Sequence, residues 1–460
     1  MTSGGAAPNV TWDAPAPDAA AAAPARRAVE SRDPATGIVW RRYDAMDGLQ
    51  VDAVVARARS AQRLWSERPL RERIETLNAF HAELFRRRRD VADTISRENG
   101  KAIPEALAAE VAVTLDIVHF VSRNAPRLLS ADWFTPSSLA LWRKRARIEH
   151  EPFGVIAVIS PWNYPFMLPA GVVLAALVTG NVAVLKPSEF TPSSAALLAE
   201  LFASAGLPEG VFSVIQGDGV TGASLARADV DKIFFTGSEA TGRRVAVACA
   251  DRLVPYVLEL GGSDAAVVLR EADVGHAASG ILWGRFANGG QTCVAPKRVF
   301  VEQDVYPAFM EAMRDRIARL QLSPDAGGNF DVGPLIRPSQ HDALLSQLND
   351  AVANGAQIEA QPSLGDGPHR TLAPTLLSNV PPDSRVLREE TFGPVLPVLA
   401  VRDADEAVER SNDSAYGLSA SVWGRDRARA LTVARRLRAG TVMINDAGAV
   451  AGMSDVPHGG

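Results

Sequence analysis

The chain has 460 residues, a length that exceeds one ordinary hydrophobic core and predicts two or three domains. Hydrophobic residues make up 47% and charged residues 22%, as in soluble globular proteins, and the net charge of −5 excludes a predominantly basic surface for nucleic acid or an anionic membrane. The two cysteines and seven histidines form neither a disulfide framework nor a CxxC or HExxH pattern, which favours the cytoplasm and predicts no metal site.

The first part of the chain is expected to be irregular and then helical. Residues 1–28 are rich in alanine and proline, and their positive charges come late, so a disordered tail fits better than a secretory signal. Residues 33–48 predict a short hairpin. Apolar residues recur at helical spacing across 51–121, with Pro69 and Pro104 where new helices can begin.

Two later stretches have an unusual composition. Residues 128–150 contain an arginine-rich alternating pattern, which predicts a long charged hairpin that projects from its domain as an assembly arm. Residues 168–185 lack charge over the length of a membrane-spanning helix, but prolines and glycines interrupt them. We therefore expect a buried helix at 170–178, a turn, and a buried strand at 182–185.

Strand and helix patterns then alternate. Predicted strands lie at 155–159, 182–185, 211–215, 232–235 and 257–260, and predicted helices follow the first four at 170–178, 193–205, 222–228 and 242–250. Such alternation predicts a parallel sheet with both faces covered, and these sheets bind nucleotides at the carboxyl ends of their strands. A second α/β pattern has helices at 272–286, 306–320 and 340–354 and strands near 298–301, 357–360, 375–377, 395–401 and 419–423.

Cys293 lies on the glycine-rich loop 288–296, between the helix at 272–286 and the strand at 298–301. A scaffold can present a reactive side chain from such a loop, and a thiolate is the strong nucleophile among common side chains. A lone cysteine is more often buried and inert, so a catalytic role depends on whether the neighbouring motifs agree with it.

Two other side chains suit acyl chemistry. Asn163 follows the strand at 155–159 between two prolines, and its amide could donate to a developing oxyanion; a turn asparagine that bonds its own backbone is the alternative. Glu259 precedes Gly261 and Gly262 and could deprotonate a thiol or a water; a salt bridge is the alternative.

Three further motifs suit a nucleotide. Lys186 and Glu189 end a strand, where a carboxylate can accept both ribose hydroxyls and repel a 2′-phosphate, and a surface ion pair is the alternative. Ser238 opens a helix after a strand, where backbone N–H groups stabilise a pyrophosphate. Glu390 and Phe392, two residues apart, could hold a ribose and a flat ring.

Together these motifs resemble the aldehyde dehydrogenase superfamily. The resemblance covers about residues 33–460 and rests on the order and spacing of SPWNYPF, KPSEFTP, FTGSEATG, ELGG, NGGQTCVAP and EETFGPV. It implies an α/β fold with an atypical Rossmann cofactor-binding domain, an α/β catalytic domain and a β-hairpin oligomerisation arm. The implied parts are a tail at 1–28, a cofactor-binding domain at 29–127 and 151–258, a catalytic domain at 259–440, and an arm of 128–150 with 441–460 in a homodimer or homotetramer.

The resemblance further implies oxidation of an aldehyde to a carboxylic acid with NAD⁺, which Glu189 favours, or with NADP⁺. Cys293 would add to the aldehyde carbon, Asn163 would hold the thiohemiacetal oxyanion, and Glu259 would activate the water that hydrolyses the thioester. The implied cofactor-binding residues are Ser160, Pro161, Trp162, Lys186, Ser188, Glu189, Phe235, Gly237, Ser238, Gly242, Leu260, Glu390 and Phe392.

Departures from the family pattern leave alternatives open. Members usually continue past the PxGG segment, here 457–460 with His458 in place of an aromatic residue, so we expect effects on assembly and activity. A CoA-acylating enzyme, which Glu259 disfavours, and a non-catalytic nucleotide-binding or structural homologue are the alternatives. An open, apolar substrate mouth is expected from Met167, Leu168, Gly171, Thr292 and Val294.

Overall fold

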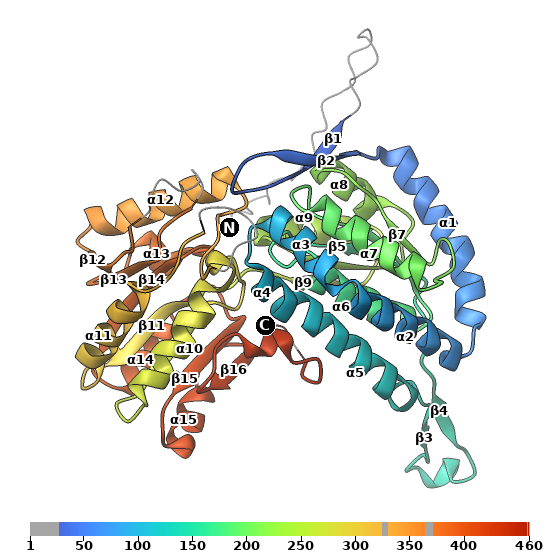
Figure 1. Ribbon diagram of the computed structural model, residues 1–460. Helices are drawn as coiled ribbons and strands as arrows, with labels where there is room; N and C mark the ends of the chain where they lie inside the picture. The colour runs from blue at the N-terminus through green and yellow to red at the C-terminus, as the bar shows by residue number, and fades with distance from the viewer. Residues whose placement is uncertain (1–26, 324–329, 364–370, 458, 460) are drawn as a thin grey trace, which may run out of the picture.

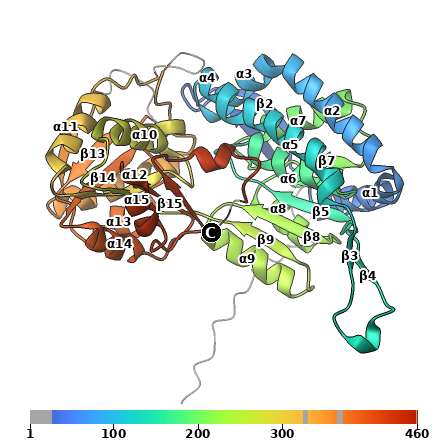
Figure 2. The ribbon, with the colours of Figure 1, turned by 90° about the horizontal axis from the view of Figure 1, so that it is seen from below.

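The computed structural model describes residues 27–323, 330–363, 371–457 and 459, so most of the tail expected at 1–28 lies outside the described residues. Two α/β bodies, each built on one large sheet, make up the molecule (Figure 1). Seen from below, the bodies lie side by side, and the red C-terminal segment lies between them (Figure 2). This architecture confirms the predicted α/β fold class.

A five-stranded sheet carries the first α/β repeat, with the parallel strand order β7-β6-β5-β8-β9. The strands are β5 (Val155–Ile159), β6 (Val182–Lys186), β7 (Phe212–Val214), β8 (Lys232–Thr236) and β9 (Tyr256–Glu259). They alternate with α6 (Met167–Val178), α7 (Pro192–Ser204), α8 (Gly219–Arg227) and α9 (Glu239–Ala250). The central strands β5 and β6 are apolar and almost wholly buried, as expected for a parallel sheet covered by helices. The predicted alternation is confirmed, and the loops after these strands meet at one edge of the sheet.

The N-terminal region is helical, as predicted, and packs against this sheet. Its elements are α1 (Gly48–Glu67), α2 (Leu70–Arg86), α3 (Arg88–Asn99), α4 (Ile103–Ala106) and α5 (Val113–Leu128). Pro69 is the N-cap residue of α2, and Pro104 lies in the first turn of α4. A π-helical turn at Leu107–Ala112, which we did not predict, joins α4 to α5. Such turns are rare and are frequent at functional sites.

The first hairpin begins before its predicted range. β1 (Ala28–Arg32) pairs antiparallel with β2 (Val39–Asp44), and the turn between them contains the expected proline and glycine. Arg27, which precedes β1, forms an ion pair of 2.9 Å with Asp218, 191 residues later in the sequence. Arg27 and Ala28 are therefore structured, in contrast to their expected place in the tail.

A seven-stranded sheet forms the second body, in the order β12-β13-β14-β11-β10-β15-β16. Its strands are β10 (Asp264–Val268), β11 (Pro296–Glu302), β12 (Gln357–Ala360), β13 (Thr375–Ser378), β14 (Val395–Val401), β15 (Ser419–Trp423) and β16 (Thr441–Ile444). The pairings are parallel except for β12 with β13. The helices of this body are α10 (Val274–Phe286), α11 (Tyr306–Ile317), α12 (Pro338–Ala353), α13 (Arg385–Arg388), α14 (Ala404–Asn412) and α15 (Arg427–Ala434).

Two strands of this sheet were missed by the sequence analysis. β10 lies near the middle of the sheet and is fully buried, but two of its five residues are alanines, which have a weak preference for strands. Its place is decided by burial between β11 and β15 rather than by local pattern. β16 pairs with β15, so residues 441–444, which belong to the segment expected in the oligomerisation arm, form the edge of this sheet.

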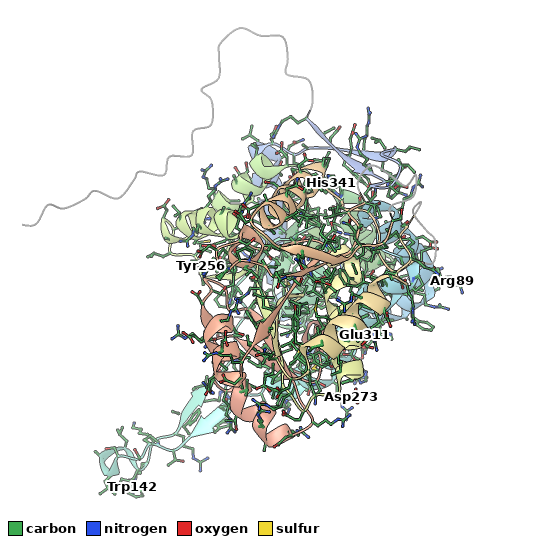
Figure 3. The ribbon with its side chains drawn as sticks, turned by 90° about the vertical axis from the view of Figure 1, so that its left-hand side faces the viewer. Arg89, Trp142, Tyr256, Asp273, Glu311 and His341 are labelled. Atoms are coloured by element: carbon green, nitrogen blue, oxygen red, sulfur yellow. The ribbon has the colours of Figure 1, made fainter. Side chains whose placement is uncertain are left out.

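The segment at 128–150 projects from the body as a hairpin, and Trp142 lies near its far end (Figure 3). β3 (Asp132–Phe134) pairs antiparallel with β4 (Ala146–Ile148), but the strands are shorter than predicted. Residues Leu139–Leu141 form a 3₁₀ turn rather than a strand. Their alternating pattern has no sheet face to bury, because the tip lies in solvent away from both bodies.

The uncharged stretch at 168–185 contributes α6 and β6 to the first body, as predicted, although α6 begins three residues earlier than expected. None of the helices in the described ranges is long and apolar enough to cross a membrane. The buried residues of α6 lie in the same hydrophobic core as those of α1, α2 and the sheet. Packing inside the protein therefore accounts for the apolar character of this stretch.

Candidate active site

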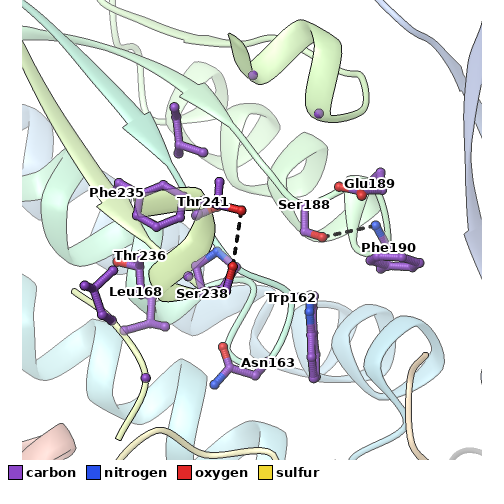
Figure 4. Close-up of a pocket in the computed structure, with 18 of the residues that line it drawn as sticks. Trp162, Asn163, Leu168, Ser188, Glu189, Phe190, Phe235, Thr236, Ser238 and Thr241 are labelled. Atoms are coloured by element: carbon purple, nitrogen blue, oxygen red, sulfur yellow. Dashed lines mark hydrogen bonds between the residues drawn. The ribbon is translucent and has the colours of Figure 1, made fainter. Parts of the chain in front are cut away.

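A cavity of about 390 Å³ lies at the carboxyl ends of the five-stranded sheet, and residues of both bodies line it (Figure 4). Most of the expected site residues share this cavity although they come from loops far apart in the sequence. The expected residues in its wall are Ser160, Pro161, Trp162, Asn163, Lys186, Ser188, Glu189, Phe235, Gly237, Ser238, Leu260, Cys293, Glu390 and Phe392.

The loop that carries Cys293 has an unusual backbone conformation. Just after α10, Asn288, Gly289 and Gly290 have φ angles of 53°, 61° and 74°. A Cβ at Gly290 would lie 2.5 Å from the carbonyl carbon of Gly393, so only glycine fits there. The Cys293 thiol lines the cavity, and desolvation raises its pKa to about 11. The thiol therefore needs a nearby base or positive charge to act as a nucleophile near neutral pH.

The side chain of Asn163 reaches this nucleophile loop. Its Nδ2 donates to the carbonyl of Gln291, 3.0 Å away and two residues before Cys293. The backbone carbonyl of Asn163 accepts from Nδ2 of Asn288 at 2.8 Å and from Nζ of Lys101 at 3.0 Å. One hydrogen of the Asn163 amide is thus occupied, which leaves the second for an oxyanion in the cavity.

A buried ion pair lies behind Asn163. Nζ of Lys101 and Oε1 of Glu110 are 2.7 Å apart, and both side chains are fully buried. The second carboxylate oxygen of Glu110 accepts the backbone N–H groups of Phe166 and Met167 at 3.0 and 2.9 Å. The carboxylate therefore satisfies donors at the start of α6, which explains why the helix begins earlier than predicted.

Lys186 and Glu189 lie close together at the end of β6. Nζ of Lys186 is 3.5 Å from Oε2 of Glu189, and both side chains line the cavity. Burial lowers the pKa of Lys186, and the Glu189 carboxylate opposes this shift. Ser188, between them, accepts the backbone N–H of Phe190 at its Oγ, 3.3 Å away (Figure 4). The pair offers a donor and an acceptor to the hydroxyls of a ribose.

Between β8 and α9 the backbone forms a cradle that fits a pyrophosphate. Ser238 lines the cavity and precedes the first residue of α9. The N–H groups of the first helical turn, which have no partner within the helix, therefore lie at the end of α9 that borders the cavity. Its Oγ donates to Oγ1 of Thr241 at 3.2 Å (Figure 4). A Cβ at Gly237 would lie 2.7 Å from the ring of Phe235, so only glycine fits there, and no side chain covers its backbone.

Two expected residues lie beside the cavity rather than in its wall. Gly242 faces Leu260, where a Cβ would lie 2.7 Å from the leucine side chain, so it acts by letting α9 pack closely. Glu259 is the last residue of β9 and is half-buried, and burial raises the pKa of its carboxyl. A carboxylate with a raised pKa is suited to general-base catalysis close to neutral pH.

The opposite wall of the cavity comes from the second body. Oε1 of Glu390 accepts the backbone N–H of Gly262 at 3.1 Å. The rings of Trp162 and Phe392 meet edge to face, with centroids 5.5 Å apart. Gln340 donates from Nε2 to the carbonyl of Phe392 at 3.3 Å. A carboxylate and two aromatic rings in this arrangement fit a ribose and a flat heterocycle.

Several residues of the cavity and its surroundings were missed because they lie outside the motifs. Arg337 and Gln340, at the start of α12, line the cavity, and the Arg337 guanidinium lies 4.9 Å from the ring centroid of Phe190. A proline after Arg337 was the available signal for a helix start, but it could not show what the helix would face. Lys297, beside the nucleophile loop, is fully buried and carried no sequence signal.

One expectation falls outside the described residues. His458 was expected to take the place of an aromatic wall of the site, and residue 458 lies outside the described residues. Gly459 is described, and a Cβ there would lie 3.2 Å from Oε1 of Glu259. The final segment of the described chain therefore passes next to the Glu259 carboxylate.

Known proteins match this chain along most of its length. The family model described as "Aldehyde dehydrogenase family" matches residues 21–460. A 4,4'-diapolycopene aldehyde oxidase of Methylomonas sp is 39% identical over 427 residues, which is 93% of this chain and 80% of the relative. A Mycobacterium tuberculosis protein named "Putative succinate-semialdehyde dehydrogenase [NADP(+)] 2" is 35% identical over 415 residues, 89% of this chain and 79% of the relative. The NAD⁺ complex of a Bacillus cereus aldehyde dehydrogenase has a TM-score of 0.87 and 32% identity, covering 91% of this chain and 85% of that one.

Proposed function

The chain belongs to the aldehyde dehydrogenase family as an NAD(P)-dependent oxidoreductase, and we propose that Cys293, Asn163 and Glu259 carry its oxidation of an aldehyde to a carboxylic acid. One observation carries the assignment. The hydrogen bond from Asn163 to the Gln291 carbonyl ties an amide donor to the loop of the cavity-lining thiol. Cys249, by contrast, is buried in the hydrophobic core.

In the first step the Cys293 sulfur adds to the aldehyde carbon. The thiol gives its proton to water, the sulfur–carbon bond forms, and the π electrons of the carbonyl move onto its oxygen. The second hydrogen of the Asn163 amide and the backbone N–H of Cys293 stabilise this oxyanion in a thiohemiacetal. Because Lys101 and Asn288 already hold the backbone carbonyl of Asn163, the donor is fixed before the substrate arrives.

A nicotinamide dinucleotide fits the rest of the cavity. Its wall contains the Lys186–Glu189 pair, the backbone segment at 237–238, and the rings of Trp162 and Phe392. When bound, it accepts a hydride, so that the carbon attached to Cys293 becomes a thioester. In our proposal the adenosine ribose is bound by Lys186, Ser188 and Glu189, and the pyrophosphate is framed by Gly237, Ser238 and the packing glycine Gly242. The nicotinamide ribose and ring are held by Trp162, Glu390 and Phe392. The rest of the cleft is formed by Ser160, Pro161, Phe235 and Leu260. The Glu189 carboxylate would repel a 2′-phosphate, which favours NAD⁺ over NADP⁺.

Glu259 resolves the thioester in the last step. Its carboxylate takes a proton from water, the water oxygen bonds to the acyl carbon, and the carbon–sulfur bond breaks with its electron pair returning to Cys293. The raised pKa of Glu259 supports this role, because a weakly acidic carboxyl is a stronger base in its ionised form. A base at this position supports hydrolysis rather than transfer of the acyl group to CoA.

We propose an uncharged, apolar aldehyde as the substrate class. Leu168 lines the cavity, and Met167 and Val294, the chain neighbours of Leu168 and Cys293, are buried apolar residues outside its wall, which supports apolar surroundings for Cys293. The two curated relatives are named for substrates that differ in charge: one for 4,4'-diapolycopene aldehyde and one for succinate semialdehyde. The apolar residues agree better with the uncharged of these two classes.

We also propose that a second copy of the chain covers the projecting hairpin, giving a homodimer or homotetramer. Trp133, Leu139 and Trp142 are 63%, 89% and 66% exposed, which is unfavourable in an isolated subunit.

The proposed cofactor domain comprises 29–127 and 151–258, and the proposed catalytic domain comprises 259–440 together with β16. The two described cysteines are free thiols, which agrees with a proposed cytoplasmic location.

The test of the proposed activity is turnover by the purified chain. Aliphatic, aromatic and ω-carboxylate aldehydes are each mixed with NAD⁺ or NADP⁺, and the near-ultraviolet absorbance of the reduced nicotinamide is followed together with the carboxylate product. We expect reduced cofactor and carboxylate in equal amounts without CoA, fastest with apolar aldehydes. Product formation that requires CoA would replace hydrolysis with acyl transfer, and a folded chain that is inactive with every aldehyde would contradict the proposal.

A further inference from the structure

We propose that Lys297 is a positioning residue for Cys293, whose ammonium group both fixes the nucleophile loop and stabilises the sulfur as a thiolate. This inference rests on the proposed role of Cys293 and assigns the positive charge that its reaction needs. Lys297 lies four residues after Cys293, at the start of β11, and its side chain turns back beneath the loop.

Two hydrogen bonds place the Lys297 ammonium against the nucleophile's own backbone. Nζ donates to the carbonyl of Cys293 at 2.6 Å and to the carbonyl of Thr292 at 3.0 Å. Both are charge-assisted bonds in a fully buried position, where they are stronger than between neutral groups. They orient the two peptide groups that flank Cα of Cys293, the atom to which Sγ is attached through Cβ.

The charges around Lys297 explain why a lysine is tolerated in so buried a place. Oε1 of Glu390 lies 3.9 Å from Nζ, and the buried carboxylate of Asp264 and the Cys293 sulfur in its thiolate form also favour the charged form of the lysine. Burial and the neighbouring Arg285 act in the opposite direction and lower the Lys297 pKa. The ammonium is therefore the centre of a cluster that contains three acidic groups.

The same cluster determines how readily Cys293 ionises. Burial raises the thiol pKa, and the carboxylates of Asp264 and Glu390 raise it further, whereas Lys297 lowers it. An adjacent cation is a common means of activating a cysteine. Removal of the Lys297 charge would leave the thiol facing burial and two carboxyl groups.

A purely structural lysine would satisfy the same two carbonyls but would not affect the ionisation of the thiol. Three versions of the full-length chain separate the two roles: wild type, Lys297→Gln, which keeps a donor but no charge, and Lys297→Arg, which keeps the charge. The rate of Cys293 alkylation by iodoacetamide is measured across pH, and mass spectrometry of peptides distinguishes Cys293 from Cys249. In this reaction the sulfur–carbon bond forms and iodide leaves.

For Lys297→Gln we expect the midpoint of the pH profile to rise by about one unit, which lowers alkylation roughly tenfold near neutral pH. Lys297→Arg should restore most of the rate. Circular dichroism establishes that each variant is folded. A Gln profile that matches wild type would overturn the proposal, as would an Arg profile shifted as far as that of Gln.

A measurement on the wild-type chain decides the matter if the variants do not fold. The carboxylates of Asp264 and Glu390 near the thiol would repel the anionic reagent iodoacetate unless the Lys297 charge offsets them. The rate with iodoacetate relative to neutral iodoacetamide should therefore be at least as high as for a small free thiol at low salt. A ratio well below that of the free thiol would overturn the role of Lys297. If Cys293 resists both reagents in the folded wild type, the assignment of the nucleophile itself fails, which is a distinct outcome.

Discussion

The side-chain amide of Asn163 donates to the backbone carbonyl of Gln291 across 3.0 Å, between positions 128 residues apart. This hydrogen bond joins the loop after β5 in one body to the nucleophile loop of the other. It fixes the distance between the proposed oxyanion donor and Cys293 without help from substrate. Preorganised donors of this kind stabilise developing charge most effectively, because they need no rearrangement during the reaction.

Asn163→Ala should slow formation of the acyl intermediate by about 10²- to 10³-fold, the typical effect of removing one oxyanion donor. Dinucleotide affinity should change much less, because the proposed ribose and pyrophosphate contacts come from other loops. Stopped-flow absorbance measures the first turnover, and calorimetry measures binding of NAD⁺. An acylation rate close to that of wild type would show that the oxyanion has other donors.

Cys293→Ala should abolish aldehyde oxidation, since no other described cysteine lines the cavity. Cys249→Ala is the matched control, because Cys249 is a free thiol buried in the core of the first body. We expect the control to keep its rate within about twofold, with only a modest loss of stability from the smaller side chain. Steady-state turnover checks both variants, and activity in Cys293→Ala would refute the nucleophile assignment.

Glu259→Gln should form one equivalent of reduced cofactor per subunit and then stop, because the thioester forms but is not hydrolysed. In the wild type, hydrolysis requires the ionised carboxylate, whose pKa burial raises above its usual value of 4.5. The hydrolysis rate should therefore fall with decreasing pH through a midpoint above that value. Rapid-quench measurement of acyl-enzyme across pH checks both points; steady turnover by the variant would assign the base elsewhere.

Glu189→Gln should bind NADP⁺ more tightly by roughly fivefold to tenfold, about 1 kcal/mol, while NAD⁺ affinity falls. The substitution removes a carboxylate that would repel a 2′-phosphate and leaves Lys186, 3.5 Å away, as a cation for it. Titration calorimetry with each dinucleotide, without aldehyde, measures the two affinities. An unchanged ratio of the two affinities would place the adenosine ribose away from Glu189.

Lys101→Met should lower the free energy of unfolding by about 3–5 kcal/mol, because it leaves the carboxylate of Glu110 buried and uncompensated. Arg71→Met is the control, since the Arg71–Glu75 pair is exposed and surface pairs contribute little. Denaturant titration followed by circular dichroism compares the two variants. Equal losses in the two variants would contradict a specific role for the buried pair.

The sequence predicted those parts of the site that depend on local chemistry. Asn163, Lys186 and Ser238 each follow an apolar strand, and parallel strands must bring their carboxyl ends to one edge, so proximity follows from alternation alone. The same reasoning failed for β10, whose two alanines give little local preference for a strand. It also failed for Leu139–Leu141, where an alternating pattern at an unsupported tip forms a turn.

Sequence by itself thus determined the α/β class, the order of most elements and the identity of the reactive loop, because these depend on periodicity, glycine and proline positions and side-chain chemistry. Only the tertiary structure decided which distant groups support that loop. Lys101 and Lys297 are both fully buried. Lys101 donates to the backbone carbonyl of Asn163, whose side chain bonds to the loop, and Lys297 donates to the loop carbonyls of Thr292 and Cys293. A buried cation is stable only where the fold supplies its partners, and partners from separate elements leave no periodic trace in the chain.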